Sequence, residues 1–169
     1  MKPKKQIPSD DGGAPHFPPA ALEIMGFLLN RPAFHLHDIT RNALRPLGLI
    51  PPDLGILSNL DSSGPQSQRV LGDRLKIDRT TMVSRIDELE KHGLVKRKSH
   101  PTDRRAYLIT LRPAGKKALA QSMRLILEID EHFLAPLTKE EQTTLKKLLT
   151  KLVMSIATAK IPQEAFKKQ

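Results

Sequence analysis

The feature that most limits the possible folds is the order of short patterns in the middle third of the 169-residue chain. A short helix is expected after Ser67, and a second helix from Arg79 to about Lys91. Two strands follow, residues 94–98 and 106–111, joined by a polar and charged loop. Two helices joined by a short turn and followed by a hairpin predict a winged helix-turn-helix, which places its second helix in the major groove of DNA.

Local signals mark both ends of this second helix. Asp78 is a favourable N-cap residue, and Gly93 is a typical helix stop. The spacing of Val83, Ile86 and Leu89 predicts that these three side chains form the face that packs on the core. The opposite face is then left for polar side chains.

Most of the remaining chain is predicted to be helical, so the expected fold class is mainly α. Apolar spacing indicates helices over residues 20–29 and 33–47, interrupted at Pro32, and Gly48 ends the second of them. Further helices are predicted from Pro51 onwards, from Pro113 to about Leu134, and after the capping box Thr138-Lys139-Glu140-Glu141.

Positive charge is concentrated in the predicted winged motif. The chain carries a net charge of +10, with 28 Lys and Arg against 18 Asp and Glu. Residues 64–112 hold 12 of these basic and 6 of these acidic side chains, a balance of +6. Such a concentration is typical of a surface that binds a polyanion such as nucleic acid, although a solvated basic face would have the same composition.

Several classes of protein are disfavoured by what the sequence lacks. With no cysteine, the chain has no disulfide, thiolate nucleophile, cysteine-ligated metal or thiol sensor. No apolar run is long enough to span a bilayer, and prolines occupy the place of a signal peptide's apolar region, so we expect a cytoplasmic protein without membrane contact. No phosphate loop, metal-ligand spacing or nucleophile elbow is present, so we expect neither an enzyme nor a cofactor.

The residues expected to contact DNA lie on the second helix and in the hairpin loop. Arginine can bind guanine through two hydrogen bonds, and threonine or serine can bind base edges or phosphates. In the loop, Arg104 and Arg105 can reach phosphates or the minor groove, and Asp103 can orient an arginine. The full expected set is Ser67, Gln68, Arg79, Thr80, Thr81, Ser84, Arg85, Lys98, Asp103, Arg104 and Arg105.

Three stretches together resemble the multiple-antibiotic-resistance regulator (MarR) family: residues 64–95, the wing Asp103-Arg104-Arg105, and Leu111-Arg112-Pro113-Ala114-Gly115. The resemblance implies a homodimer whose terminal helices interlock and whose two winged motifs bind a palindromic operator on double-stranded DNA. It implies that Arg105 enters the minor groove and Arg104 touches phosphate, while Thr80, Thr81, Ser84 and Arg85 face the major groove. Members are usually repressors released by a small molecule, often an aromatic acid, although some are activators.

With this resemblance, the chain is predicted to have five segments: an extended proline-rich arm (1–19), N-terminal dimerisation helices (20–50), a winged helix-turn-helix (51–112), C-terminal dimerisation helices (113–160) and a tail (161–169). An alternative is a winged-helix protein-interaction module that does not bind DNA, or an activator without a small-molecule response. Intact arginines at positions 79, 85, 104 and 105 argue against a loss of DNA binding.

Two departures from the family pattern fall at predicted helix starts. Ile50 and Arg112 stand where relatives commonly have a capping threonine or serine. The loss of a cap typically costs ~1 kcal/mol, which loosens a helix boundary without changing the fold.

A ligand site is expected beside the helix over residues 33–47. His35, His37, Arg41 and Arg45 could hold the carboxylate of an effector of unknown identity, although surface or interface roles are the simpler explanation of these residues. A metal site is not expected, because His35 and His37 are two residues apart and project from different sides of a helix.

Overall fold

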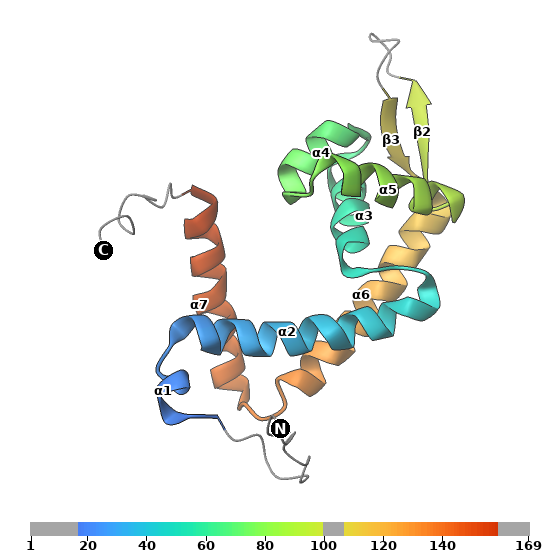
Figure 1. Ribbon diagram of the computed structural model, residues 1–169. Coiled ribbons are helices and arrows are strands. Elements are labelled where there is room, and N and C mark those ends of the chain that lie inside the picture. Colours follow the sequence, from blue (N-terminus) through green and yellow to red (C-terminus); the bar gives the residue numbers. More distant parts are fainter. Residues whose placement is uncertain (1–16, 100–106, 159–169) are drawn as a thin grey trace, which may run out of the picture. The chain divides into compact units, whose positions relative to one another are not determined.

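The computed structural model describes residues 17–99 and 107–158, and these divide into two compact units within one helix, between Ile39 and Thr40. The first unit contains α1 (Pro19–Leu22) and the start of α2 (Met25–Leu44) (Figure 1). The Phe17 ring meets Phe27 edge-on, with centroids 5.4 Å apart, and Arg31 lies over Phe17 at 5.7 Å. This small aromatic and cation–π cluster fixes the entry of the chain into α2.

The predicted break at Pro32 is wrong, because α2 continues through this proline. A proline inside a helix removes one backbone hydrogen bond, and the turns on either side of it keep theirs. The helix then tightens into the 3-10 turn η1 (Arg45–Leu47), and Gly48 ends it in the left-handed conformation with φ of 67°. Glycine adopts this conformation without strain, so the predicted stop at Gly48 is confirmed.

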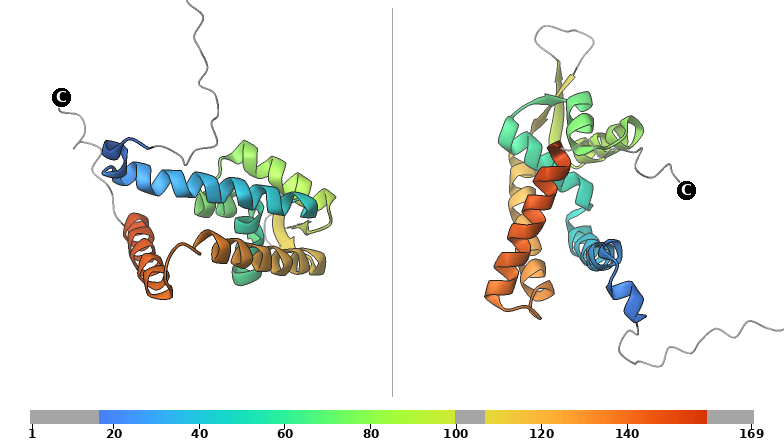
Figure 2. Two further views of the ribbon diagram at one scale, coloured as in Figure 1. Left: turned by 90° about the horizontal axis from the view of Figure 1, so that it is seen from below. Right: turned by 90° about the vertical axis from the view of Figure 1, so that its left-hand side faces the viewer.

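The second unit carries the winged helix-turn-helix. After the end of α2 and η1 it contains α3 (Pro51–Ser63), β1 (Gln66–Ser67), α4 (Gln68–Leu75), α5 (Arg79–Lys91), β2 (Val95–Ser99), β3 (Tyr107–Leu111), α6 (Pro113–Phe133) and α7 (Lys139–Thr158). Helix α3 packs against α4, α6 and β3, while α5 packs against α4 and β2. Strands β2 and β3 project from these helices as a hairpin (Figures 1 and 2).

The sheet is antiparallel and has the strand order β1-β3-β2. Its hairpin pairs Val95 with Leu111 at the base and Ser99 with Tyr107 at the outer end. The third strand, β1, was not predicted, because its two residues are too few for an alternating pattern to be recognised. The winged motif expected from the sequence is therefore confirmed, with one more strand than the two expected.

One apolar core joins α3, α4, α5, the sheet and α6. Its buried members are Leu44, Leu49, Ile56, Leu57, Leu60, Leu71, Met82, Ile86, Leu89, Leu94, Val95, Ile109 and Leu119. Two of the three residues predicted for the inner face of α5 are among them, but Val83 is 40% exposed and Met82 is buried in its place. Both side chains are apolar, so the spacing alone could not distinguish which of them faces the core.

Large apolar side chains remain exposed on the terminal helices of this single chain. Those on α1, α2 and the residues between them are Leu22, Ile24, Met25, Leu28, Leu29 and Phe34, and those on α7 are Leu148, Leu149, Leu152, Val153, Met154 and Ile156. Exposed apolar side chains gathered on one element are typical of a protein-binding surface. Within the described ranges, no helix is both long and apolar enough to cross a membrane.

Candidate DNA-binding interface

The turn between α4 and α5 sets the angle of the two helices. Helix α4 ends at Lys76, which is left-handed with φ of 55°, and Ile77 N–H donates to the carbonyl of Gly72. A Cβ on Gly72 would come within 3.0 Å of the Ile77 carbonyl oxygen, so a larger residue at 72 would push the turn outwards. This close approach lets the chain reverse within three residues and enter α5.

Both predicted N-caps are present. Ser67 Oγ accepts a hydrogen bond from Val70 N–H at 3.3 Å, and Asp78 Oδ1 accepts one from Thr81 N–H at 2.9 Å. Hydrogen bonds from the Thr81 side chain and backbone hold the pKa of Asp78 below its usual value. Asp78 also places its carboxylate at the positive end of the α5 dipole, where a negative charge is favourable.

Four of the five residues of α5 that were predicted to contact DNA are exposed, namely Arg79, Thr80, Thr81 and Ser84. They occupy the first two turns of the helix. Thr80, Thr81 and Ser84 project away from the buried face, whereas Arg79, three residues before the buried Met82, lies beside it. A helix that docks its N-terminal half into the major groove presents such residues to base edges and phosphates.

Arg85 lies apart from this set. Its Nε and Nη2 donate to Oδ1 and Oδ2 of Asp53 at 2.8 and 2.7 Å, and only 17% of its side chain is exposed. The hydrogen bonds to Asp53 raise the pKa of Arg85 despite its partial burial. Because this edge of the guanidinium is already bound to a carboxylate, it is not available for a two-bond contact with guanine.

Ser67 and Gln68, at the start of α4, are half-buried. The side chain of Gln68 lines a cavity of about 460 Å³ together with Arg69, Met82 and other residues of α4 and α5. Its Nε2 is buried and has no hydrogen-bond partner among the described residues. Gln68 therefore has an unused donor beside the helix-turn-helix.

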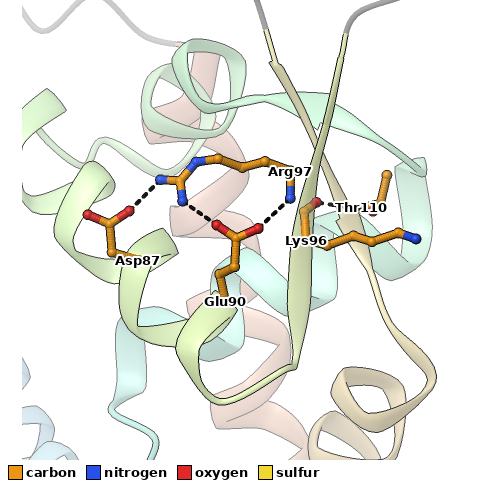
Figure 3. A network of polar contacts seen from close by, with 5 residues as sticks. All are labelled: Asp87, Glu90, Lys96, Arg97 and Thr110. Atoms are coloured by element: carbon orange, nitrogen blue, oxygen red, sulfur yellow. Dashed lines mark hydrogen bonds and ion pairs between the residues drawn. The ribbon is translucent and has the colours of Figure 1, made fainter.

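A polar clamp that the sequence analysis missed ties β2 to α5 (Figure 3). The Arg97 guanidinium binds Asp87 at 2.6 Å and also pairs with Glu90, whose other oxygen accepts the Arg97 N–H at 2.7 Å. These bonds from Arg97, the backbone N–H foremost, hold the pKa of Glu90 below its usual value. Strand alternation could have revealed the clamp, because Val95 and Arg97 share a face and Val95 is buried.

The clamp and the sheet hold the base of the wing. Thr110 Oγ1 donates to the Lys96 carbonyl oxygen at 3.1 Å, which adds a side-chain link between β3 and β2 (Figure 3). Lys98 is exposed near the outer end of β2, where Ser99 pairs with Tyr107. The predicted wing residues Asp103, Arg104 and Arg105 lie outside the described residues.

A second cavity, of about 450 Å³, lies within the second unit. Arg41, Asn42, Arg45, Gly48, Leu49, Ile50, Arg85 and Glu88 line it. It thus brings together two of the four residues expected to hold a ligand, Arg41 and Arg45. The other two, His35 and His37, are exposed on α2 in the first unit. Among the described residues, no group of three His, Cys, Asp or Glu side chains is arranged to hold a metal ion.

Comparisons with known proteins agree with this geometry. The sequence profile of the MarR family matches residues 47–106. A proposed transcriptional regulatory protein for the hcr operon of Thauera aromatica is 32% identical over 129 residues, which cover 76% of this chain and 78% of that protein. The chain belongs to the MarR family. It is accordingly a DNA-binding transcriptional regulator and not an enzyme.

Solved MarR-type structures share the fold. The transcriptional repressor CouR bound to a 23-mer DNA duplex superposes with a TM-score of 0.74 at 23% identity, over 83% of this chain and 99% of that one. The Mycobacterium tuberculosis MarR family protein Rv2887 in complex with salicylic acid gives a TM-score of 0.63 at 29% identity, over 76% of this chain and 96% of that one.

The two departures from the MarR pattern leave both helix starts at the predicted residues, Pro51 for α3 and Pro113 for α6. Ile50 has no capping side chain, but Asp53 Oδ2 accepts the Ile50 N–H at 2.9 Å, so α3 still begins at Pro51. Arg112 also has no capping side chain, and its N–H donates to the Leu94 carbonyl oxygen at 2.9 Å. In both places a residue other than the cap satisfies a backbone group of the helix start.

Proposed function

We propose that this MarR-family protein is a homodimeric repressor that binds a palindromic operator and is released by a small aromatic acid. The observation that carries the proposal is the outer face of α5. Its first two turns expose Arg79, Thr80, Thr81 and Ser84, while the side chains of its inner face are buried in the core. This arrangement presents hydrogen-bonding side chains to base edges on a rigid helix.

The remaining DNA contacts are proposed for the wing and the start of α4. Arg105 enters the minor groove, Arg104 binds phosphate, and Asp103 orients the arginines, as the family resemblance implies. Ser67, Gln68 and Lys98 are proposed to contact the backbone. The clamp of Arg97 with Asp87 and Glu90 supports this role of the wing, because it fixes the direction of β2 relative to α5.

The terminal helices are proposed as the dimer interface. Leu152, Val153 and Ile156 on α7 are 47%, 64% and 63% exposed, and Leu28 and Leu29 on α2 are also exposed. Burial of such side chains against a second copy removes apolar area from water, at roughly 25 cal/mol per Å². A two-fold dimer then presents two α5 helices to the two halves of a palindrome.

The effector is proposed to be a small organic anion held in the cavity of Arg41 and Arg45. Two guanidinium groups beside the apolar side chains of Leu49 and Ile50 suit a carboxylate on an aromatic ring. The solved complex of the relative Rv2887 with salicylic acid supports this ligand class.

The test is a DNA titration by fluorescence anisotropy. A duplex of roughly 30 base pairs, about three helical turns, is selected by the wild-type protein from a random pool. We expect Arg105→Ala to weaken binding about tenfold or more, because one arginine contact with DNA is worth about 1–3 kcal/mol. Arg124→Ala, at an exposed position of α6, is the matched control and should bind normally.

Salt dependence separates this function from a protein-interaction module. Binding through phosphates weakens steeply with salt, with a slope of about −0.9 per phosphate contact on a logarithmic plot. Absence of DNA binding at low salt would favour the interaction module, and an unchanged affinity of Arg105→Ala would refute the assignment of the wing.

A further inference from the structure

The buried carboxylate of Asp53 is the strongest polar anchor of α5. Asp53 is fully buried in the first turn of α3, and three donors surround it. Oδ1 accepts from Arg85 Nε at 2.8 Å, and Oδ2 accepts from Arg85 Nη2 at 2.7 Å and from Ile50 N–H at 2.9 Å. A charged group in this environment is stable only with such partners, so the pair has a single favourable arrangement.

The pair joins two elements whose relative orientation matters for DNA reading. Arg85 lies one turn after Thr81 and next to Ser84, at the edge of the buried face of α5. Apolar contacts of Met82, Ile86 and Leu89 decide which side of the helix is buried and contribute to its rotation about its own axis, but they are non-directional. A two-bond guanidinium–carboxylate contact at the edge is directional and defines that rotation.

We infer that Arg85 is a positioning residue, held by Asp53, that sets the rotation of α5 and does not itself read bases. The inference rests on the proposed role of α5 in the major groove. The ion pair replaces the direct guanine contact that residue type and helical position predicted for Arg85. In this arrangement the carboxylate of Asp53 on α3, 32 residues before Arg85, orients Thr81 and Ser84 towards the groove.

Four variants test this inference. Asp53→Asn keeps an oxygen that can accept the Ile50 N–H but removes the charge, and Arg85→Met keeps the length of the side chain without the guanidinium. The double variant has neither charge, so it leaves no unpaired ion in the core. Asp61→Asn is the matched control, because it alters a carboxylate on the same helix whose pair with Lys116, at 3.6 Å, is exposed.

Affinity is measured for the duplex selected above and for a scrambled duplex of the same composition. We expect Asp53→Asn and Arg85→Met each to lower the affinity for the selected duplex about tenfold, with the scrambled duplex and the salt slope unchanged. The affinity of the double variant for the selected duplex should be no lower than that of the weaker-binding single variant, because both changes break the same interaction. Asp61→Asn should bind as the wild type does.

Direct base reading by Arg85 gives a different pattern. Asp53→Asn would then leave binding unchanged or strengthen it by releasing the guanidinium, and this result would overturn the inference. If circular dichroism shows that a single variant is unfolded, the double variant is used in its place. A folded double variant that binds the selected duplex with wild-type affinity would also overturn the inference. Ser84→Ala and Thr81→Val report separately on the proposed function, since wild-type selectivity in both would show that α5 does not read the groove.

Discussion

Replacement of Gly115 by alanine should destabilise the winged domain through one backbone clash. Gly115 lies in the first turn of α6 and is buried. A Cβ at this position would lie 2.2 Å from the carbonyl oxygen of Leu94 and 2.7 Å from Cδ1 of Leu111. The Leu94 carbonyl accepts the Arg112 N–H at 2.9 Å, so the glycine lets α6 begin directly against the entry to β2.

The magnitude follows from opposing contributions. Forced overpacking of a core costs about 1–3 kcal/mol, and loss of the hydrogen bond from Arg112 to Leu94 adds about 1 kcal/mol. Alanine recovers about 1 kcal/mol of helix propensity relative to glycine. The net destabilisation is about 1–3 kcal/mol, which lowers the Tm by about 2–4 °C per kcal/mol in a chain of this size.

The assay is thermal and urea unfolding at one fixed protein concentration, because the stability of the proposed dimer depends on concentration. Gly55→Ala in α3 is the matched control. The three atoms nearest to its Cβ all belong to the flexible Leu75 side chain, with Cδ2 at 3.1 Å, so this variant should stay within about 1 kcal/mol of the wild type. A Gly115→Ala protein as stable as the wild type would refute the close approach of α6 to Leu94.

Three further predictions concern the clamp, the dimer and the ligand. Since the pKa of Glu90 is lowered in the folded state, its stabilising effect is full above the unfolded value of about 4.3 and is lost as the pH falls through the folded value. The Tm difference between wild type and Glu90→Gln should therefore shrink from pH 7 to pH 3, and a constant difference would contradict this. Leu152→Glu should weaken the dimer by about 2 kcal/mol or more in light scattering, while Lys151→Glu leaves it intact; an undiminished Leu152→Glu dimer would exclude this face of α7. Salicylate, as a probe of the proposed ligand class, should raise the Tm of the wild type, and Arg45→Met should abolish this shift without loss of DNA binding; a retained shift would remove Arg45 from the proposed ligand site.

Local signals in the sequence predicted most of the elements of the winged motif. Asp78 caps α5 through Thr81 N–H, Ser67 caps α4, and Gly48 ends η1 with a positive φ. Each of these signals acts within a few residues, so it can be recognised in the sequence without knowledge of the fold. By contrast, β1 has two residues and depends wholly on its partner β3, so it carries no pattern of its own.

The candidate site was predicted less completely than the fold. The exposed set on α5 follows from helical spacing, but Arg85 was assigned to DNA because its type and position fit that role. Its partner Asp53 is 32 residues away, and no periodicity connects the two. The pairing of Arg97 with Glu90 likewise depends on how β2 packs on α5.

The sequence by itself determined the winged helix-turn-helix, the positive charge on that motif and the family. These depend on caps, spacing and composition, which are properties of neighbouring residues. Only the tertiary structure decided that Met82 and not Val83 enters the core, and that Arg85 is bound to Asp53. These outcomes depend on which surfaces meet in the folded core, where burial makes an unpaired charge or an empty space costly and so selects one arrangement.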